Sequence, residues 1–177
     1  MNNLNKLNTP LQRLIMISMI ATIYSVISLL GATYSFSNIQ IRFAEILCLL
    51  PIFLPWSIWG VTLGCFITNL LGAVFGFNPI GFIDMIFGTL ATFIAAYLTF
   101  RFRNVRIKDL PILSVMMPVV VNAIIIGLEL TFVFGSGNMK LFWIFALEVG
   151  IGQFIACVVF GLPLVYRLGK YNMFKQI

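Results

Sequence analysis

The sequence predicts an all-α integral membrane protein, a bundle of six transmembrane helices. Of its 177 residues, 61% are hydrophobic and only 9% are charged, whereas a soluble domain carries about 25% charged residues. The mean hydropathy is +1.07, and charge-free stretches reach the length of about 20 residues that a helix needs to cross the hydrocarbon core. Residues 1–177 are therefore expected to form a single transmembrane domain.

The first three helices are expected at about residues 11–33, 44–55 and 57–75. The stretch from Ile46 to Ile83 carries no charge and is too long for one helix. Pro51 and Pro55, followed by Trp56, interrupt it. Because proline disfavours helix at the residue before it, the stretch divides into a short second helix, kinked at Pro51, and a third one.

The last three helices are expected at about residues 83–100, 111–134 and 140–166. A loop rich in glycine and proline at 76–81 precedes the fourth helix, and Pro111 suits the first turn of the fifth. The residues from Gly135 to Asn138 form the turn before the sixth. Six spans place both termini on the same side of the membrane.

The basic residues predict that this side is the cytoplasm. Nine of the eleven Lys and Arg residues fall on the side of the termini, and an excess of basic residues marks the cytoplasmic side. Only Arg42 and Lys140 fall on the other side. No small-x-small cleavage site follows the first helix, so it is not expected to be a cleaved signal peptide. The nine residues are Lys6, Arg13, Arg101, Arg103, Arg106, Lys108, Arg167, Lys170 and Lys175.

Missing residue types argue against several function classes. Histidine is absent, which removes the usual metal ligand and general base, so neither a metal nor a cofactor is expected. There is no G-x-x-x-x-G-K-[ST] phosphate loop and no clear pair of nucleophile and base, so the chain is not expected to be an enzyme. The basic residues lie at helix ends, which indicates topology rather than nucleic-acid binding. Cys48, Cys65 and Cys157 are interpreted as small core hydrophobes.

Polar side chains within the spans indicate a binding site. Such residues are costly in lipid and usually face the bundle interior or a water-filled cavity. Four of the five acidic residues fall in the outer half of the bundle, whereas the inner halves of the last three helices carry almost no strong polar group. This distribution predicts a cup open to the outside rather than a channel. The candidate substrate-binding residues are Arg42, Glu45, Asn69, Asp84, Asn122, Glu129, Glu148 and Gln153.

Several of these residues also have a structural interpretation. Asp84 suits the N-terminal end of a helix dipole, Arg42 and Glu45 suit an interfacial ion pair, and Asn69 and Asn122 suit hydrogen bonds between helices. A structural role does not explain the two remaining glutamates as well, because they lie inside spans with no Lys or Arg nearby in sequence. Those two are Glu129 and Glu148.

The composition of the candidate site favours a cation or a ligand rich in hydrogen-bond donors. A carboxylate can accept two parallel bonds from a planar N–H pair, and Asn or Gln can serve a neighbouring carbonyl or amide edge. Aromatic residues near the outer mouth suit stacking on a flat ring or a cation, or else an interfacial aromatic belt. They are Phe43, Phe77, Phe82 and Trp143.

Small side chains at helical spacing line one face of the first helix. This stripe lets another helix approach closely, either a partner protein or a helix of the same bundle. The pairs Gly60-x-x-x-Gly64 and Gly72-x-x-x-Gly76 in the third helix are assigned to packing within the bundle. The candidate docking residues are Ser18, Ala21, Thr22, Ser25 and Ser28.

Three blocks of sequence carry a resemblance to a known family. They are Ile39-Gln40-Ile41-Arg42-Phe43-Ala44-Glu45 leading into Leu49-Leu50-Pro51, Gly64-Cys65-Phe66-Ile67-Thr68-Asn69, and Asp84 before Phe87-Gly88-Thr89-Leu90-Ala91-Thr92. They resemble the substrate-binding S components of energy-coupling-factor (ECF) transporters, and within them the queuosine-precursor (QueT) family. The resemblance covers residues from about 10 to 166, and the Arg-x-x-Glu of the first block is its most specific feature.

The resemblance implies a six-helix bundle that captures a 7-deazaguanine such as preQ1, preQ0 or queuine from outside the cell. The bundle would then dock on a membrane T component coupled to two cytoplasmic ATPases. Other S components dock through an Ala-x-x-x-Ala motif in the first helix, and here the matching pair is Ala21-x-x-x-Ser25. The ligand chemistry suits Glu45, Glu129 and Glu148 as acceptors, Asn69, Asn122 and Gln153 at the ring edge, and Arg42 at the mouth.

Two other functions fit the same sequence. One is an S component for another small solute, such as a vitamin. The other is a stand-alone proton-coupled carrier, in which Glu129 and Glu148 would relay protons. A ligand panel distinguishes the first alternative, and uptake that needs a proton gradient and no ATPase would identify the second.

Overall fold

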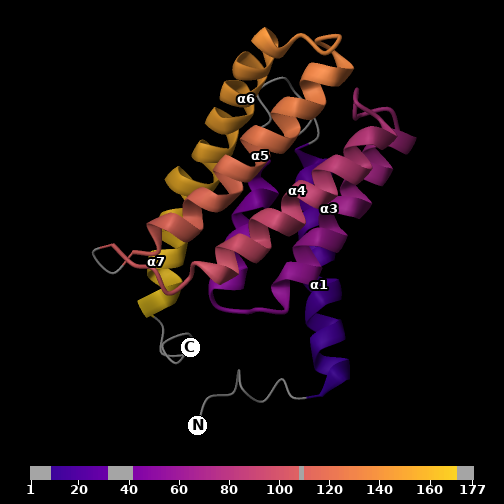
Figure 1. Ribbon diagram of the computed structural model, residues 1–177. Coiled ribbons are helices and arrows are strands. Elements are labelled where there is room, and N and C mark those ends of the chain that lie inside the picture. Colours follow the sequence, from indigo (N-terminus) through magenta and orange to yellow (C-terminus); the bar gives the residue numbers. More distant parts are fainter. Residues whose placement is uncertain (1–8, 32–41, 108–109, 171–177) are drawn as a thin grey trace.

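The computed structural model describes residues 9–31, 42–107 and 110–170 (Figure 1). These residues form helices and no strand, and one isolated backbone bridge joins Ile107 and Leu110. The predicted all-helical class is therefore confirmed. The elements in order are α1 (Pro10–Leu30), the 3₁₀ helix η2 (Phe43–Ile52), α3 (Ser57–Val74), α4 (Phe82–Arg101), α5 (Ile112–Val133), α6 (Met139–Phe154), the π-helix η3 (Ile155–Gly161) and α7 (Leu162–Lys170).

Five helical segments of the described chain are long and apolar enough to cross a membrane. They are α1, α3, α4, α5 and the continuous segment Met139–Gly169, which contains α6, η3 and most of α7. Thr9 caps the start of α1 by accepting a hydrogen bond from the Gln12 amide at 3.3 Å. α1 ends at Leu30, and residues 32 and 33 of the expected first helix lie outside the described residues.

The second helix differs most from its expected form. It is a 3₁₀ helix of 10 residues rather than an α-helix over 44–55. At about 2.0 Å of rise per residue it covers about 20 Å, which is shorter than the hydrocarbon core of about 30 Å. Pro51 lies inside it and cannot donate a backbone hydrogen bond. The described residues therefore form five long helices and one short one, and the second of the six expected spans is shorter than the hydrocarbon core is thick.

The last long helix contains a π-helical stretch that the hydrophobic pattern did not indicate. α6 continues into η3 and then α7 without a break. Pro163 follows η3 closely, and proline removes one backbone hydrogen bond and crowds the carbonyl four residues earlier. The wider π turn brings Cys157 and Gly161 against η2, where Leu49 fills the space that a Gly161 side chain would take.

The short helix η2 is the centre of the bundle. It contacts α1, α3, α4, α5 and η3, so most of its side chains are buried. α3 and α4 form one antiparallel pair, and α5 and α6 form another (Figure 1). α1 begins and α7 ends at the same end of the bundle, and the turn between α5 and α6 lies at the opposite end (Figure 1).

Small residues let α1 and α3 approach closely. A Cβ atom built on Gly64 would lie 2.7 Å from Cβ of Tyr24, and one on Gly60 would lie 2.8 Å from Cβ of Ile20. The Ser25 hydroxyl donates a hydrogen bond of 3.0 Å to the Gly64 carbonyl. The glycines of α3 thus pack inside the bundle and hold Tyr24 beside η2.

Gly64→Ala is expected to reduce the free energy of unfolding by about 1–3 kcal/mol, the usual range for an added methyl group in a packed core. The new Cβ would force α1 away from α3. Gly150→Ala is the matched control, because its Cβ would meet Ala123 Cβ at 3.6 Å, an ordinary contact, and alanine favours helix over glycine. Chemical unfolding in detergent measures both variants. Equal stability of the two would contradict the close packing of α1 on α3.

The bundle exposes large apolar side chains and buries several charged ones within an otherwise apolar core. Leu30, Phe132 and Trp143 are 85%, 68% and 74% exposed, whereas Glu45 and Asp84 are 1% and 0% exposed. A soluble protein distributes these residue types the other way round. The outer surface therefore suits contact with lipid, and the interior holds the charged groups.

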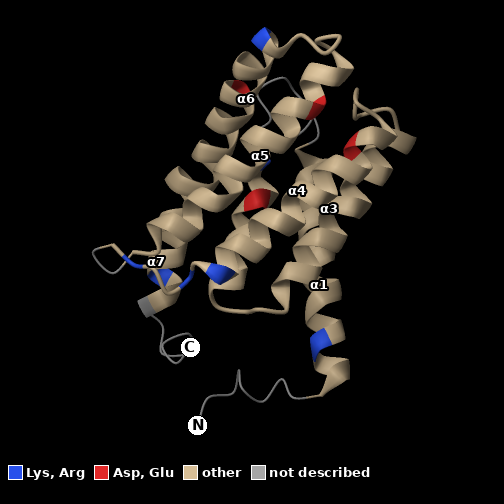
Figure 2. Ribbon diagram, in the orientation of Figure 1, with Lys and Arg blue, Asp and Glu red and all other residues tan. Residues whose placement is uncertain are grey.

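Charge is distributed unevenly along the bundle axis. Figure 2 shows most Lys and Arg residues at the end where α1 begins and α7 ends, and the Asp and Glu residues between the middle of the bundle and the opposite end. The basic residues described at the first end are Arg13, Arg101, Arg103, Arg106 and Arg167. Lys6, Lys108 and Lys175 lie outside the described residues.

Candidate substrate-binding site

A buried ion pair joins η2 to α4. Nη2 of Arg42, the residue before η2, lies 2.7 Å from Oδ2 of Asp84 in the first turn of α4, and the two side chains are 4% and 0% exposed. The Asn78 side-chain amide donates to the same carboxylate oxygen at 2.8 Å. Removing two ions from water costs several kcal/mol per ion, which only good geometry and further hydrogen bonds offset. Arg42 therefore pairs with Asp84, whereas the sequence suggested Glu45.

The Asp84 carboxylate also lies against α3. The Asn69 amide donates a hydrogen bond of 2.9 Å to the Asp84 backbone carbonyl. Gly88 makes this contact geometrically feasible, because a Cβ atom there would collide with Asp84 Oδ1 and lie 2.6 Å from Asn69 Nδ2. Within the described residues, Asp84 Oδ1 and Asn69 Oδ1 are buried and accept no hydrogen bond. Two buried acceptor atoms are thus without a partner in the described part of the chain.

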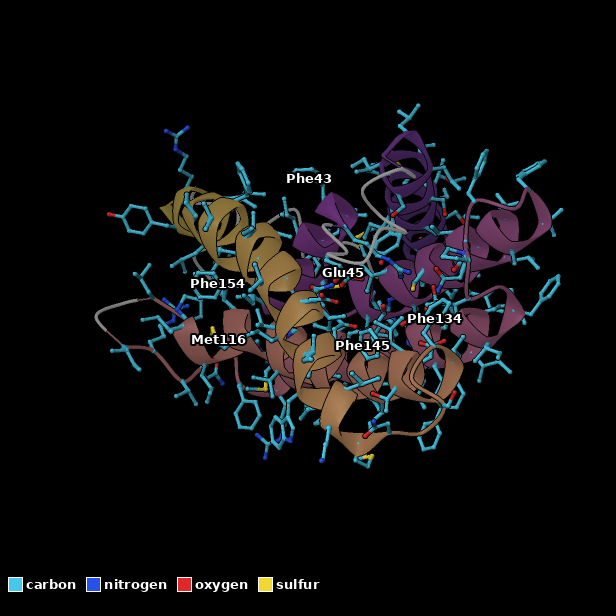
Figure 3. The ribbon with its side chains drawn as sticks, turned by 90° about the horizontal axis from the view of Figure 1, so that it is seen from above. Phe43, Glu45, Met116, Phe134, Phe145 and Phe154 are labelled. Carbon is cyan, nitrogen blue, oxygen red and sulfur yellow. The ribbon has the colours of Figure 1, made fainter. Side chains whose placement is uncertain are left out.

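Glu45 is fully paired by side chains of the bundle. One carboxylate oxygen accepts from the Tyr24 hydroxyl at 2.6 Å and from Thr92 at 3.5 Å, and the other accepts from the Cys48 thiol at 3.0 Å. Seen along the bundle, Glu45 lies at its centre (Figure 3). The first turn of η2 is therefore fixed to α1 and α4 through this one carboxylate.

The three cysteines are buried and free, and each also makes a polar contact near Glu45. The Cys65 sulfur lies 3.2 Å from the Thr92 hydroxyl oxygen, whose single proton can go either to this sulfur or to Glu45. The Cys157 thiol lies 3.6 Å from the Glu45 carbonyl and 3.8 Å from Gln153 Oε1. Their interpretation as small core hydrophobes is therefore incomplete, because they also satisfy polar groups.

Glu129 and Asn122 on α5 differ from the groups above. Their side chains are 4% and 3% exposed. Within the described residues, the two carboxylate oxygens of Glu129 have no hydrogen-bond partner, and the Nδ2 atom of Asn122 has none either. More than about 90% of buried polar groups are hydrogen-bonded, and a buried group without a partner lowers stability. These atoms are therefore candidate ligand contacts.

The packing of α4 on α5 brings Glu129 to the level of Asp84. The Thr99 hydroxyl on α4 donates to the Ser114 carbonyl on α5 at 3.1 Å, which fixes the antiparallel register. Asp84 lies 15 residues before Thr99, and Glu129 lies 15 residues after Ser114. In an antiparallel pair of helices these equal spacings place Asp84 and Glu129 at the same level. We define the upper polar layer as Arg42, Asn69, Asn78, Asp84 and Glu129.

The same register, with that of α5 on α6, defines a second layer about two turns away. Thr92 comes level with Asn122, and the approach of Gly150 to Ala123 brings Gln153 to a similar level. Gln153 is 3% exposed. We define the lower polar layer as Tyr24, Glu45, Thr92, Asn122 and Gln153.

Seven of the eight predicted site residues fall in these two layers. Glu148, the eighth, lies half-buried on α6, and no hydrogen bond of its side chain is described. Tyr24, Asn78 and Thr92 were missed. Asn78 was read only as a loop residue, and Tyr24 and Thr92 join the site through partners 21 and 47 residues away in sequence, which no local pattern indicates.

The structure divides the stripe of small residues on α1. Ala21, Ser25 and Ser28 are 2%, 7% and 0% exposed, and Ala21 and Ser25 pack against α3, so these three residues are not available for docking as expected. Ser18 and Thr22 are exposed. They line an apolar groove on the outside of the bundle together with Leu14, Ile15, Met19 and Ile23.

Comparison with known proteins identifies a related family. A family model described as QueT transporter matches residues 14–170. No curated protein and no solved structure matches the chain. With the five long apolar helices, the family match shows a multi-pass membrane protein that takes part in transport.

Proposed function

Because the chain belongs to the QueT transporter family, we propose that it is the substrate-binding S component of an ECF importer for a queuosine precursor. Its substrate class is the 7-deazaguanines, of which preQ1, preQ0 and queuine are examples. The chain binds the substrate and does not transform it.

The proposed topology has both termini in the cytoplasm. The bundle end that carries Arg13, Arg101, Arg103, Arg106 and Arg167 faces inward, as expected from the excess of basic residues on the cytoplasmic side. The short η2 is the return from the outer side to the inner side, so the chain passes six times between the two ends. The acidic residues of both polar layers then lie between the middle of the bundle and its outer end.

The observation that carries the proposal is the set of buried polar atoms without partners. Carboxylate oxygens of Glu129 and Asp84 and the Asn69 Oδ1 atom accept hydrogen bonds, and the Asn122 amide donates them. A 7-deazaguanine presents the complementary groups: a ring N–H beside an exocyclic amine, and a carbonyl. The aminomethyl group of preQ1 adds a cation, which suits a site with several carboxylates.

The site residues fall into two groups according to whether their polar atoms already have partners within the bundle. We propose that Glu129, Asn122, Asn69 and Asp84 contact the ligand, since each has a buried atom with no hydrogen-bond partner in the described part of the chain. Arg42 holds Asp84 in place from the opposite side.

Three further residues have supporting or adjacent positions. Glu45 fixes η2 through its hydrogen bonds to Tyr24 and Cys48. Gln153 approaches from the lower layer, and Glu148 supplies a second carboxylate from α6.

The proposed partners are a membrane T component and two cytoplasmic ATPases. The chain has no phosphate-binding loop of its own, so the energy for transport comes from other subunits. The groove of Leu14, Ile15, Ser18, Met19, Thr22 and Ile23 on α1 is the proposed contact with the T component. Small side chains at Ser18 and Thr22 let a partner helix approach closely.

Thermal unfolding with a ligand panel tests the substrate class. The purified protein is expected to show a higher Tm with preQ1, preQ0 or queuine than without ligand, because a ligand that binds only the folded state stabilises it. Guanine and a set of vitamins serve as controls, and mass spectrometry identifies any molecule that co-purifies. Stabilisation by a vitamin and by none of the deazaguanines would reject the proposal. Uptake by proteoliposomes of this chain alone, driven by a proton gradient, would instead favour the proton-coupled carrier.

A further inference from the structure

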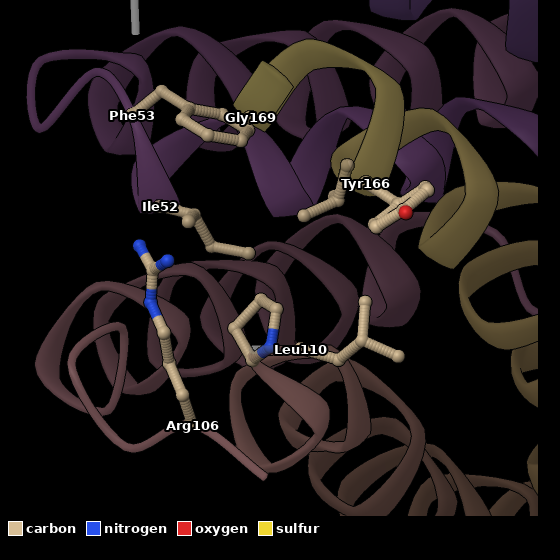
Figure 4. A pocket seen from close by; sticks show the side chains of 8 residues that line it. Ile52, Phe53, Arg106, Leu110, Tyr166 and Gly169 are labelled. Atoms are coloured by element: carbon tan, nitrogen blue, oxygen red, sulfur yellow. The ribbon is translucent and has the colours of Figure 1, made fainter. Parts of the chain in front are cut away.

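A second pocket lies at the basic end of the bundle, and none of its lining residues belongs to either polar layer. Figure 4 shows this pocket from close by. It opens between the end of η2, the segment before α5, and α7, and its volume is about 270 Å³. The substrate proposal does not use this pocket. It is lined by Ile52, Phe53, Arg106, Leu110, Pro111, Val165, Tyr166 and Gly169.

The pocket combines an apolar wall with a basic rim. Ile52, Phe53 and Val165 are 5%, 6% and 4% exposed and form the wall. Arg106 and Tyr166 are exposed, and in Figure 4 the Arg106 side chain extends across the pocket toward Ile52. Within the described part of the chain, Arg106 forms no ion pair. The rim therefore offers a positive charge beside an apolar surface.

The backbone holds the two sides of this rim in place. The Ile107 amide donates to the Leu110 carbonyl at 2.9 Å, and the Leu110 amide donates back at 3.1 Å. This reciprocal pair fixes Arg106 beside Leu110 and Pro111 at the start of α5. The position of the charge is thus set by the fold.

The pocket selects for an anion that carries an apolar tail. Inorganic phosphate would use Arg106 but leave the apolar wall open, and a neutral lipid would use the wall but leave Arg106 without a counter-ion. The volume lies just below the 300–1,000 Å³ of pockets that enclose a whole drug-sized ligand, so it accommodates part of a larger molecule. The pocket also lies at one end of membrane-spanning helices, where lipid headgroups are, and basic pockets between such helices bind anionic headgroups.

We propose that this pocket binds an anionic phospholipid. The phosphate contacts the Arg106 guanidinium, Tyr166 lies at the headgroup level as interfacial tyrosines do, and the first part of an acyl chain covers Ile52, Phe53 and Val165. Because η2, the α5 start and α7 all line the pocket, the lipid joins three elements and stabilises the folded bundle.

Native mass spectrometry of the full chain in detergent, titrated with phosphatidylglycerol, tests this proposal. One phosphatidylglycerol molecule is expected to bind more tightly than phosphatidylcholine and to raise the Tm. Arg106→Gln is expected to weaken this binding by about fivefold or more, since a basic residue near an anionic lipid surface contributes on the order of 1 kcal/mol and about 1.4 kcal/mol is tenfold.

Arg101→Gln is the matched control. Arg101 is an exposed arginine at the same end of the bundle and does not line the pocket, so this variant should bind phosphatidylglycerol as the parent does. Arg106→Gln should still show the rise in Tm that a deazaguanine causes in the parent protein. This result would verify that the variant is folded, and it would test the lipid site separately from the substrate site.

Three results would overturn the lipid site. They are equal affinity for phosphatidylglycerol and phosphatidylcholine, equal losses in Arg106→Gln and Arg101→Gln, and displacement of phosphatidylglycerol by millimolar inorganic phosphate. The last result would identify a site for a free anion.

Discussion

Glu129→Gln is expected to weaken preQ1 binding by about ten- to a hundredfold. A hydrogen bond to a charged group contributes about 1.5–3 kcal/mol, and about 1.4 kcal/mol changes an affinity tenfold. The ligand-free variant should be as stable as the parent protein or more stable, because the amide removes a buried carboxylate that has no partner within the described residues. Isothermal titration calorimetry measures the affinity, and chemical unfolding measures the stability.

Glu148→Gln is the matched control for this experiment, because it makes the same chemical change on the neighbouring helix α6. Glu148 is only half-buried, so a smaller loss of affinity is expected. If Glu129→Gln bound preQ1 as tightly as the parent protein, Glu129 would not be a ligand contact. The assignment of the upper polar layer to the substrate would then fail.

Arg42→Met is expected to lower the free energy of unfolding by about 3–5 kcal/mol, the usual effect of removing one partner of a buried ion pair. Asp84 would remain 0% exposed with its negative charge and without the guanidinium that now lies 2.7 Å away. Because the pair joins η2 to α4, the loss should also loosen the centre of the bundle. Equilibrium unfolding in detergent provides the measurement.

The double variant Arg42→Met with Asp84→Leu separates lost charge pairing from lost packing. Replacing both partners of a buried pair by apolar residues is often neutral, so the double variant should recover most of the lost stability. It should nevertheless bind deazaguanines poorly, since Asp84 is a proposed ligand contact. If the double variant were as unstable as Arg42→Met alone, the loss of stability would not come from the unpaired charge of Asp84.

The arrangement of the polar groups separates residues that hold the bundle together from the proposed ligand contacts. Glu45 and Arg42 are satisfied by partners from other elements, which fixes η2 among α1, α3 and α4. The Glu129 carboxylate and the Asn122 Nδ2 atom are equally buried yet have no hydrogen-bond partner among the residues that the structure describes. Hydropathy does not distinguish these two groups, because an intramembrane glutamate has the same sequence signature whether it holds a helix or a substrate.

Composition and charge spacing were sufficient for the all-helical class, the long apolar helices and most of the polar residues that gather in the two layers. α3 and α4 begin and end within one residue of their expected bounds, because each is a continuous apolar run with breakers at both ends. The second helix was expected to be short, but its 3₁₀ conformation and the π turn of η3 were not expected. Both elements pack against each other at the centre of the bundle. The spacing of apolar residues in the sequence does not indicate this packing.

The sequence by itself determined that this chain lies in a membrane, since too few of its residues are charged for a water-exposed surface, and where its costly polar groups fall along each helix. Only the tertiary structure decided which of these groups pair with one another. Pairing depends on the register between helices, which close contacts such as Gly64 on Tyr24 and Thr99 on Ser114 set. The partners in such contacts are too far apart in the chain for a local pattern to reveal them.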